Sequence, residues 1–272
     1  MGAAHHGKSE DDDMRIDRLN RIEQYVIQKE TASLEELSET FAVSMNTVRR
    51  DVKELLDRGV LQKVYGGVAV KPVVQTALPL PMSIRASQLP DAKQEIGRLA
   101  ATLVQDNSSI FLDSGSTTPN ILQHLQDMSR VTLITHSLSA LYEAARYPNL
   151  HVIALGGAYN PDTASYMDIA SLDALSRMTM DTIFIAATGV SLENGLTNTT
   201  FLEAEIKRLV VQRGKKVVLL ADHTKFDHSS IITFCNFKDL SCVVTDRLPS
   251  QAYLDAMKAY NIQLLCPETE KK

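Results

Sequence analysis

From Asp91 to the end of the chain, short runs of apolar residues alternate with longer segments of helical periodicity. The apolar runs lie at residues 110–112, 131–134, 152–155, 182–186, 217–221, 242–245 and 262–265. Helical segments include residues 91–106, 138–146, 169–178, 202–212 and 251–260. Continuous apolar strands separated by helices are typical of a parallel sheet that is covered on both faces. We therefore expect a mostly parallel α/β domain over 91–272, with ligands bound beyond the carboxyl ends of its strands.

The segment FLDSGSTTPNILQHL (111–125) places a polar loop directly after one of these strands. Asp113 to Thr118 form the loop, and Pro119 is a favoured residue in a first helical turn. Gly115 lets the backbone approach a ligand, and hydroxyl groups together with the free N–H groups of a helix can surround a phosphate. The alternative is a plain capped turn, because short loops of Ser, Thr and Gly are common.

Other polar segments also follow predicted strands. In LLADHTKF (219–226), Lys225 is either a surface residue or an anion partner beside the phosphate loop. Glu203 and Lys207 lie four residues apart on one helix, and a helix-stabilising salt bridge worth roughly a few tenths of a kcal/mol is the simplest explanation. The glycine pair at 156–157 is expected to form a tight turn.

The N-terminal part has a different pattern, with three short helical segments followed by two short strands. Apolar residues at helical spacing predict helices over 18–30 and 33–43. Ser33 with Glu36 three residues later is a capping-box pattern at the start of the second helix. A tight turn then leads to a third helix, and VLQKVYGGVAV (60–70) predicts two strands around a glycine pair. This order is that of a winged helix-turn-helix.

The third helix, which Ser44 caps and Gly59 ends, has one apolar and one basic face. The apolar stripe consists of Val48, Val52, Leu55 and Leu56, and the opposite stripe of Asn46, Arg49, Arg50 and Lys53. A major groove about 12 Å wide admits one helix, whose N-terminal residues reach base edges. The guanidinium groups suit either a guanine edge or phosphates, although a solvated basic face is the simpler alternative. The expected DNA contacts are Ser44, Asn46, Thr47, Arg49, Arg50, Lys53 and, in the wing, Tyr65.

Composition favours a soluble globular protein: of 272 residues, 44% are hydrophobic and 22% charged. No apolar run reaches about 18 residues, so no membrane span is predicted. The net charge is −5, but residues 14–71 carry ten Lys and Arg against nine Asp and Glu. The cations of this segment are concentrated on one helix face, and the local field matters more than the total charge. The three cysteines lack C-x-x-C spacing, which favours a reduced cytoplasmic protein without a metal site.

Four segments are predicted along the chain. Residues 1–13 are polar and are expected to be an added leader, with Met14 as the natural start. Residues 14–70 form the winged helix-turn-helix. Residues 71–90 contain four prolines and are expected to be a linker or extended connection. Residues 91–272 form the α/β domain.

The motifs resemble those of DeoR-type bacterial transcription regulators over nearly the whole chain from about Met14. RRDVKELLDRGVLQKVYGG resembles the DNA-binding signature of that family, with Tyr65 and Val68 where the family often has histidine and alanine. The motifs D-S-G-S-T-T, L-x-G-G-x-Y, IAATGV, G-L-T and A-D-H-T-K-F resemble its effector domain, which is similar to ribose-5-phosphate isomerase. His136 stands where the family usually has asparagine, and Asp168 where it often has glycine. His136 is either a spacer or a specificity residue, and we interpret it as a spacer.

The resemblance implies a sugar-phosphate effector bound on the 113–118 loop. The expected effector contacts are Asp113, Gly115, Ser116, Thr117, Thr118, Asp222 and Lys225. The implied protein is a cytoplasmic homo-oligomer, dimer or tetramer, that needs no cofactor and represses a carbohydrate catabolic operon until a phosphorylated sugar releases it from operator DNA. An isomerase-like enzyme with an accessory domain stays open, because Asp113, Asp222 or Glu203 could serve as its base. A purely oligomerising α/β domain is the third alternative.

Overall fold

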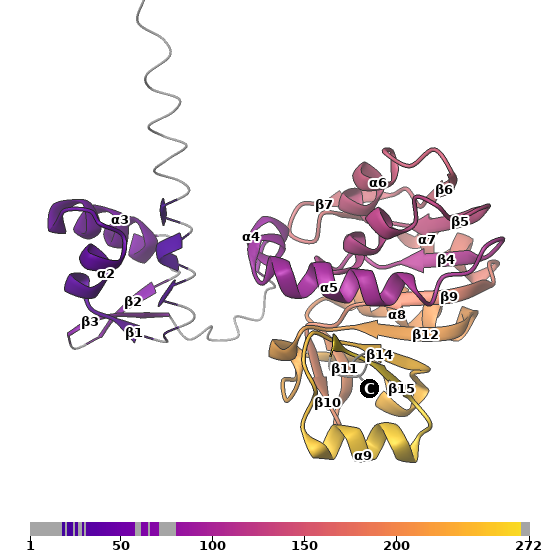
Figure 1. Cartoon of the computed structure of the whole chain (residues 1–272). Helices are drawn as coiled ribbons and strands as arrows, with labels where there is room; N and C mark the ends of the chain where they lie inside the picture. Colours follow the sequence, from indigo (N-terminus) through magenta and orange to yellow (C-terminus); the bar gives the residue numbers. More distant parts are fainter. Residues whose placement is uncertain are drawn as a thin grey trace, which may run out of the picture. The chain divides into compact units, whose positions relative to one another are not determined.

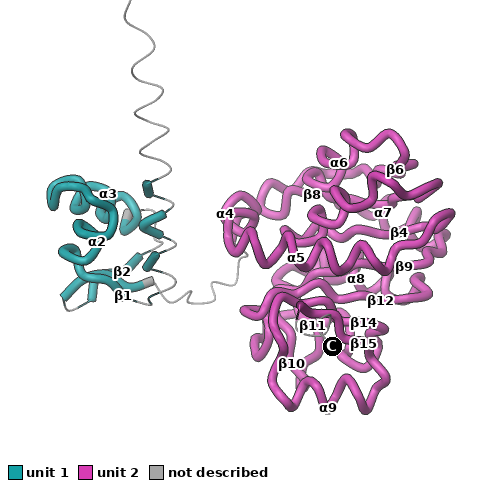
Figure 2. Tube along the Cα trace, in the orientation of Figure 1, with its two compact units in different colours: residues 1–76 teal, residues 77–272 magenta. Residues whose placement is uncertain are grey.

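The computed structural model describes Arg18, Leu19, residues 21–23, 25, 26 and 29, and the ranges 31–57, 61–64, 66–70 and 80–267. The chain divides into two compact units, residues 1–76 and 77–272 (Figure 2). The boundary lies within the segment 71–90 that we predicted as a linker. The predicted leader 1–13, the helix end at Gly59 and the wing residue Tyr65 lie outside the described residues.

Helices of the first unit pack around a small apolar core. The described residues between 18 and 29 are helical, and Leu19, Ile22 and Val26 are buried against α2 (Leu34–Thr40) and α3 (Met45–Asp57). The Ser33 hydroxyl accepts the Glu36 amide at 3.0 Å, as predicted. The Glu36 carboxylate accepts a hydrogen bond from the Tyr25 hydroxyl at 2.8 Å, so this side chain ties two helices together.

A three-stranded antiparallel sheet completes the first unit. Its strands are β1 (Thr31–Ala32), β2 (Leu61–Val64) and β3 (Gly67–Val70), in the order β1-β3-β2. The pair β2–β3 is the predicted hairpin, and the two-residue β1 is too short to be recognised from sequence. A Cβ at Gly67 would lie 2.2 Å from the carbonyl oxygen of Ala32. Glycine is therefore required where β3 meets β1.

Seven parallel strands form the central sheet of the second unit (Figure 1), in the order β15-β14-β12-β9-β4-β5-β6. They are β4 (Ser109–Leu112), β5 (Val131–Thr135), β6 (Leu150–Ala154), β9 (Met180–Ile185), β12 (Gly214–Leu220), β14 (Cys242–Val244) and β15 (Gln263–Leu265). All seven coincide with the predicted apolar runs, which confirms the parallel α/β fold. The chain leaves β4 toward β5 and β6 and then returns to β9 on the other side. The carboxyl ends of β4 and β9 therefore mark the switch point where such sheets bind ligands.

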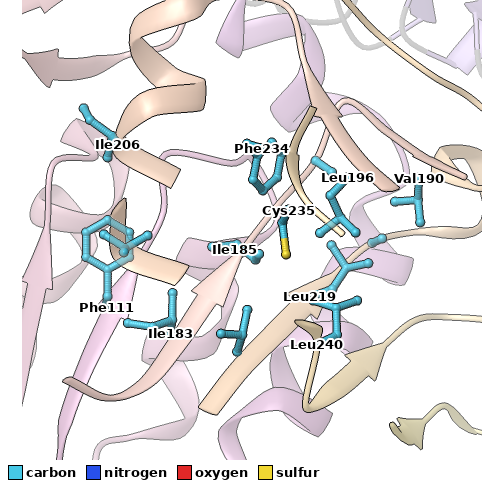
Figure 3. Close-up of a cluster of buried hydrophobic side chains, with 14 of the residues drawn as sticks. Phe111, Ile183, Ile185, Val190, Leu196, Ile206, Leu219, Phe234, Cys235 and Leu240 are labelled. Atoms are coloured by element: carbon cyan, nitrogen blue, oxygen red, sulfur yellow. The ribbon is translucent and has the colours of Figure 1, made fainter. Parts of the chain in front are cut away.

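Helices cover both faces of this sheet because successive strand residues point to opposite sides. Ile110 and Leu112 pack with α5 (Pro90–Ala101), the 3-10 helix η1 (Thr118–His124) and α6 (Leu138–Ala144). Phe111 faces the other side. That side is covered by α7 (Ile169–Ser176), α8 (Phe201–Arg213) and α9 (Gln251–Ala259). Figure 3 shows the buried apolar residues on the face that α7, α8 and α9 cover. Phe111 lies near Ile183 there, and Leu219 lies near Leu240.

Several elements differ from the sequence predictions. The helix expected at Pro119 is a 3-10 helix. An antiparallel sheet of β10 (Gly189–Ser191), β11 (Gly195–Asn198) and β13 (Ile232–Cys235), and a hairpin of β7 (Ala158–Asn160) and β8 (Ser165–Met167), were not predicted. These strands have only three or four residues, and all but β13 lie in segments too polar to give a strand signal. Within the predicted linker, Met82–Ser87 forms helix α4, and the Met82 amide donates to the Asp162 carbonyl at 3.1 Å. The expectation of an extended connection is therefore wrong for this part.

Candidate functional site

The basic face of α3 is free for a ligand. Asn46, Arg49, Arg50 and Lys53 are exposed, while the opposite face is buried in the core of the first unit. The three cations form no ion pair with any residue that the structure describes. An uncompensated row of cations attracts polyanions, and the arginine forks can bind either phosphates or base edges.

Two neighbours of this face have structural roles. The Asp51 carboxylate is fully buried and accepts a hydrogen bond from the Arg18 Nε at 2.7 Å, so it does not neutralise the neighbouring basic face. The Ser44 hydroxyl caps α3 by accepting the Thr47 amide at 3.2 Å, and the two hydroxyls lie 2.9 Å apart. Of the predicted contacts, Ser44 and Thr47 thus already stabilise the helix start.

In the second unit, polar residues gather at the edge of the sheet where the parallel strands have their carboxyl ends. We call this edge the crevice. Asp113 follows β4, His136 follows β5, and Asp222 and Lys225 follow β12. The Ala186 amide, just after β9, donates to the Asp113 carboxylate at 3.0 Å and joins the two strands of the switch point. The fold therefore brings together loops that are more than a hundred residues apart.

Asp113 forms a buried ion pair with Lys207. Lys207 Nζ lies 2.9 Å from Asp113 Oδ2, and both side chains are almost fully buried. Lys207 also donates to the Ala186 carbonyl at 2.7 Å and to Asn198 Oδ1 at 3.2 Å. Burial alone would raise the pKa of Asp113, but Lys207, His136 and the Ala186 amide hold it below its usual value. Asp113 is therefore an anionic support beneath the crevice.

This pairing corrects the predicted salt bridge between Glu203 and Lys207. Glu203 Oε2 accepts from Asn198 Nδ2 at 2.9 Å and from Thr200 Oγ1 at 2.7 Å, whereas Lys207 turns to Asp113. A signal for this was present in the sequence, because Lys207 occupies a buried position on α8 between the core residues Ala204 and Val210.

The hydroxyl-rich loop divides into inner and outer residues. The Thr118 hydroxyl is fully buried and donates within the loop to the carbonyls of Asp113 at 2.6 Å and Gly115 at 3.0 Å. A Cβ at Gly115 would lie 2.3 Å from Ala186 Cβ, so this glycine permits close packing. Ser116 is half-buried and Thr117 is buried, and neither forms a side-chain hydrogen bond within the described part of the chain. Both hydroxyls can therefore bond to a ligand, and Ser116 is the more exposed of the two residues.

Asp222 precedes a short 3-10 helix, η2 (His223–Lys225), and Lys225 is the last residue of that helix. Asp222 is buried and caps η2 by accepting the Thr224 amide at 3.0 Å. Lys225 is half-buried and has no ion-pair partner among the residues described. Next to them, the His223 Nδ1 lies 2.7 Å from Asp246 Oδ2, which fixes the orientation of that imidazole.

Two cations that the sequence predictions missed also reach the crevice. Lys93 of α5 is only 4% exposed, and desolvation lowers its pKa to about 8 although Asp222 opposes the shift. Lys225 and Arg85 of α4 also lie close enough to affect it. Burial lowers the pKa of Arg85, against the attraction of Glu203 and Asp113. Lys93 precedes Ile96 by three residues, so a cation on the apolar face of a helix was the available signal.

The two residues that differ from the usual family pattern, His136 and Asp168, have separate structural roles. His136 is fully buried, its Nε2 lies 3.7 Å from Asp113 Oδ1, and burial lowers its pKa to about 4. Neither ring nitrogen has a hydrogen-bond partner within the described chain. His136 is thus a neutral neighbour of Asp113, and its interpretation as a spacer stays a prediction. Asp168 caps α7 by accepting the Ser171 amide at 2.8 Å.

Within the described residues, no cluster of His, Cys, Asp and Glu could hold a metal ion, and no helix is long and apolar enough to cross a membrane.

Comparison with known proteins agrees with this arrangement in both units. Residues 18–72 match the model of the DeoR-like helix-turn-helix domain, and residues 89–247 match the DeoR C terminal sensor domain. The chain is 36% identical over 249 residues to the HTH-type transcriptional regulator IolR of Bacillus subtilis (strain 168), covering 92% of this chain and 98% of that protein. It is 26% identical over 250 residues to the glycerol-3-phosphate regulon repressor of Escherichia coli (strain K12), with coverage of 92% and 98%.

Among solved structures, the ribose 5-phosphate isomerase A of Methanocaldococcus jannaschii matches with a TM-score of 0.37 and 22% identity, covering 50% of this chain and 54% of that chain. The two domain models together cover most of the sequence, each on the unit where the structure has the corresponding fold. The chain therefore belongs to the DeoR family of helix-turn-helix transcriptional regulators.

Proposed function

We propose that the protein represses transcription by binding operator DNA through the exposed face of α3, and that a phosphorylated sugar bound in the crevice releases it. The observation that carries the DNA-binding role is the row of exposed cations on α3, which pair with no acidic residue that the structure describes and are held outward by the buried stripe behind them. The relative named glycerol-3-phosphate regulon repressor supports repression and a link to a phosphorylated metabolite. A homo-oligomer, dimer or tetramer, would present two such helices to two operator half-sites.

For the effector, we propose that Lys225 and Lys93 bind the phosphate, with the Ser116 and Thr117 hydroxyls completing its surroundings. Lys225 lacks an ion pair with any described residue, and Lys93 is a desolvated cation whose charge a phosphate would stabilise. Asp113, Gly115, Thr118 and Asp222, which we predicted as direct contacts, are proposed to shape the crevice from below because their polar atoms are already engaged or buried.

A gel shift tests this function as a whole. The full chain is incubated with DNA from upstream of its own gene and titrated with a panel of phosphorylated sugars. We expect a specific complex that one or a few of these compounds dissociate, while the unphosphorylated sugars have no effect. A protein that binds no DNA under any condition would contradict the repressor role.

Replacing Lys225 with methionine should weaken effector binding and leave operator binding unchanged. A charge-assisted contact to phosphate is worth roughly 1.5–3 kcal/mol, or about 10- to 100-fold in affinity. Calorimetry with the sugar phosphate that is active in the gel shift measures the loss. Lys216→Met is the matched control, because Lys216 is an exposed cation on β12, the strand that precedes Lys225, and lies away from the carboxyl end of that strand. Wild-type affinity in Lys225→Met would disprove the phosphate role.

Anion binding in the crevice should also depend on pH through Lys93. Its pKa of about 8 in the free protein means that it is charged below that pH and loses its proton above it. An anion stabilises the charged form, so affinity should be constant below about pH 7.5 and decrease toward pH 9. Sulfate is a suitable probe because it does not titrate in this range. Lys93→Met should bind sulfate more weakly and with a flatter profile, and an unchanged slope would exclude Lys93.

The alternative of an isomerase has less support from the site. All three carboxylates considered as bases accept hydrogen bonds or pair with a cation: Asp113 with Lys207, Asp222 with Thr224, and Glu203 with Asn198. A general base must be free to accept a proton from its substrate. Incubation with ribose 5-phosphate followed by NMR tests this, and turnover that Glu203→Gln abolishes would support the enzyme instead.

A further inference from the structure

Helix α4 is fastened to the second unit by a small set of polar contacts. The Arg85 Nε donates to the Leu80 carbonyl at 2.9 Å, and its Nη2 reaches the Asp162 carbonyl at 3.4 Å. The Met82 amide donates to the same Asp162 carbonyl at 3.1 Å. In the sequence, α4 directly follows the segment 71–79 that connects the two units. Any change in these contacts therefore acts on the chain where it leaves the second unit.

Lys93 is shared between α4 and the crevice. Its Nζ donates to the carbonyl of Arg85, in the last turn of α4. Carbonyl groups in the last turn of a helix have no partner within the helix, so a lysine there stabilises the helix end. The same ammonium lies close enough to Asp222 and Lys225 for their charges to shift its pKa. One buried cation thus bonds to the end of α4 and lies within electrostatic reach of the place proposed for the effector phosphate.

We propose that Lys93 and Arg85 make α4 a latch that anion binding in the crevice releases. This inference rests on the proposed effector site. It concerns how binding at that site affects the chain where it leaves the second unit. An ammonium bonds more strongly to an anionic phosphate than to a neutral carbonyl. A phosphate beside Lys225 therefore draws Lys93 Nζ away from the Arg85 carbonyl.

Loss of that contact is sufficient to loosen α4. The helix has six residues, Met82–Ser87, and helices this short are marginal without tertiary contacts. Its Ile84 side chain is exposed, so Met82 is the only residue of α4 in the apolar core of the part that the structure describes. Polar contacts hold the rest. Released, α4 no longer fixes the chain entering the connecting segment, and the geometry required for operator binding is lost.

Hydrogen exchange of the full chain tests the latch with sulfate as the probe. In wild type, saturating sulfate should speed exchange of the amides of Ile84 and Arg85, which both donate to the Pro81 carbonyl. Lys225→Met should show slow exchange with or without the same sulfate concentration, because it keeps the latch and binds the anion weakly. Lys93→Met should show fast exchange in both conditions, because its latch is already open.

Operator binding gives the second readout, without any effector. Lys93→Met should bind the operator about 5- to 150-fold more weakly than wild type, the usual range of allosteric coupling, whereas Lys225→Met should bind it normally. If Lys93→Met does not fold, Arg85→Gln decides, since it removes the donors to Leu80 and Asp162 and should have the same two effects.

Two outcomes would overturn the latch. One is α4 exchange that sulfate slows or leaves unchanged in wild type although calorimetry shows sulfate bound. The other is normal operator binding by a folded Lys93→Met or Arg85→Gln protein. Both differ from failure of the effector site itself, in which Lys225→Met would bind sulfate as tightly as wild type.

Discussion

Lys207→Met is expected to lower the free energy of unfolding of the second unit by about 3–5 kcal/mol, the cost of removing one partner from a buried ion pair. Methionine has a similar length but leaves the Asp113 carboxylate without its cation, 0% exposed. The Ala186 carbonyl and Asn198 Oδ1 also lose a donor. Urea denaturation of the full chain, followed by circular dichroism, measures the difference.

The matched control is Arg177→Met. Arg177 pairs with Asp173 at 2.8 Å, but the two side chains are 76% and 61% exposed. Exposed pairs contribute about 0–1 kcal/mol, so this variant should unfold almost like wild type. Adding Asp113→Asn to Lys207→Met should restore part of the lost stability, because the double variant no longer buries a lone charge. Equal costs for the buried and exposed pairs would contradict the role assigned to Lys207.

The pH dependence of this pair has a definite sign. The pKa of Asp113 is lower in the folded protein than in an unfolded chain, where it is about 3.9. Its contribution to stability is therefore complete at neutral pH and is lost as the pH falls through the acidic range. The stability difference between wild type and Lys207→Met should accordingly decrease on acidification.

Arg49→Ala and Arg50→Ala are each expected to weaken operator binding substantially. A contact to a base edge would cost about 1–3 kcal/mol, or roughly 5- to 150-fold, and relax specificity at one position. A contact to phosphate alone would weaken binding to all sequences and reduce the salt slope by about one. Gel shifts at several salt concentrations, with operator and scrambled DNA, separate the two contributions.

Arg146→Ala serves as the control for these variants. Arg146 is an exposed arginine of the second unit that pairs only with Glu143 among described residues, so its removal changes net charge without touching α3. Both α3 variants should keep wild-type stability, since the two side chains are exposed and outside the core. Unchanged operator binding in both would show that another surface contacts the DNA.

The elements with strong apolar patterning were predictable. Seven apolar runs gave the seven strands of the parallel sheet, and the 3.6-residue period of 46–57 gave α3 with its basic face outward. In both cases the pattern of apolar residues within one segment is sufficient to predict the element. The short strands β7, β8, β10 and β11 were not predicted, because residues such as Ser191 and Thr197 are placed by pairing between strands and leave no local apolar signal.

The partners of the crevice residues depended on tertiary structure. Lys207 was expected to pair with Glu203, four residues away, because that is the pairing available to an isolated helix. In the fold, Asp113 arrives from a strand 94 positions earlier and takes the ammonium at 2.9 Å. A buried carboxylate without a cation costs several kcal/mol, whereas an exposed ion pair on a helix contributes only about 0–1 kcal/mol. Lys207 therefore pairs with Asp113 and not with Glu203.

The sequence by itself thus determined the class of each unit, the positions of the main strands along the chain and the outward cations of α3, since each of these follows from periodicity along one segment. Only the tertiary structure decided which cations reach the crevice. Lys93 and Arg85 come from helices that precede the sheet, and Lys207 from a helix after β11. Their convergence near Asp113 and Asp222 depends on the packing of helices over strand ends, which no local pattern in the chain encodes.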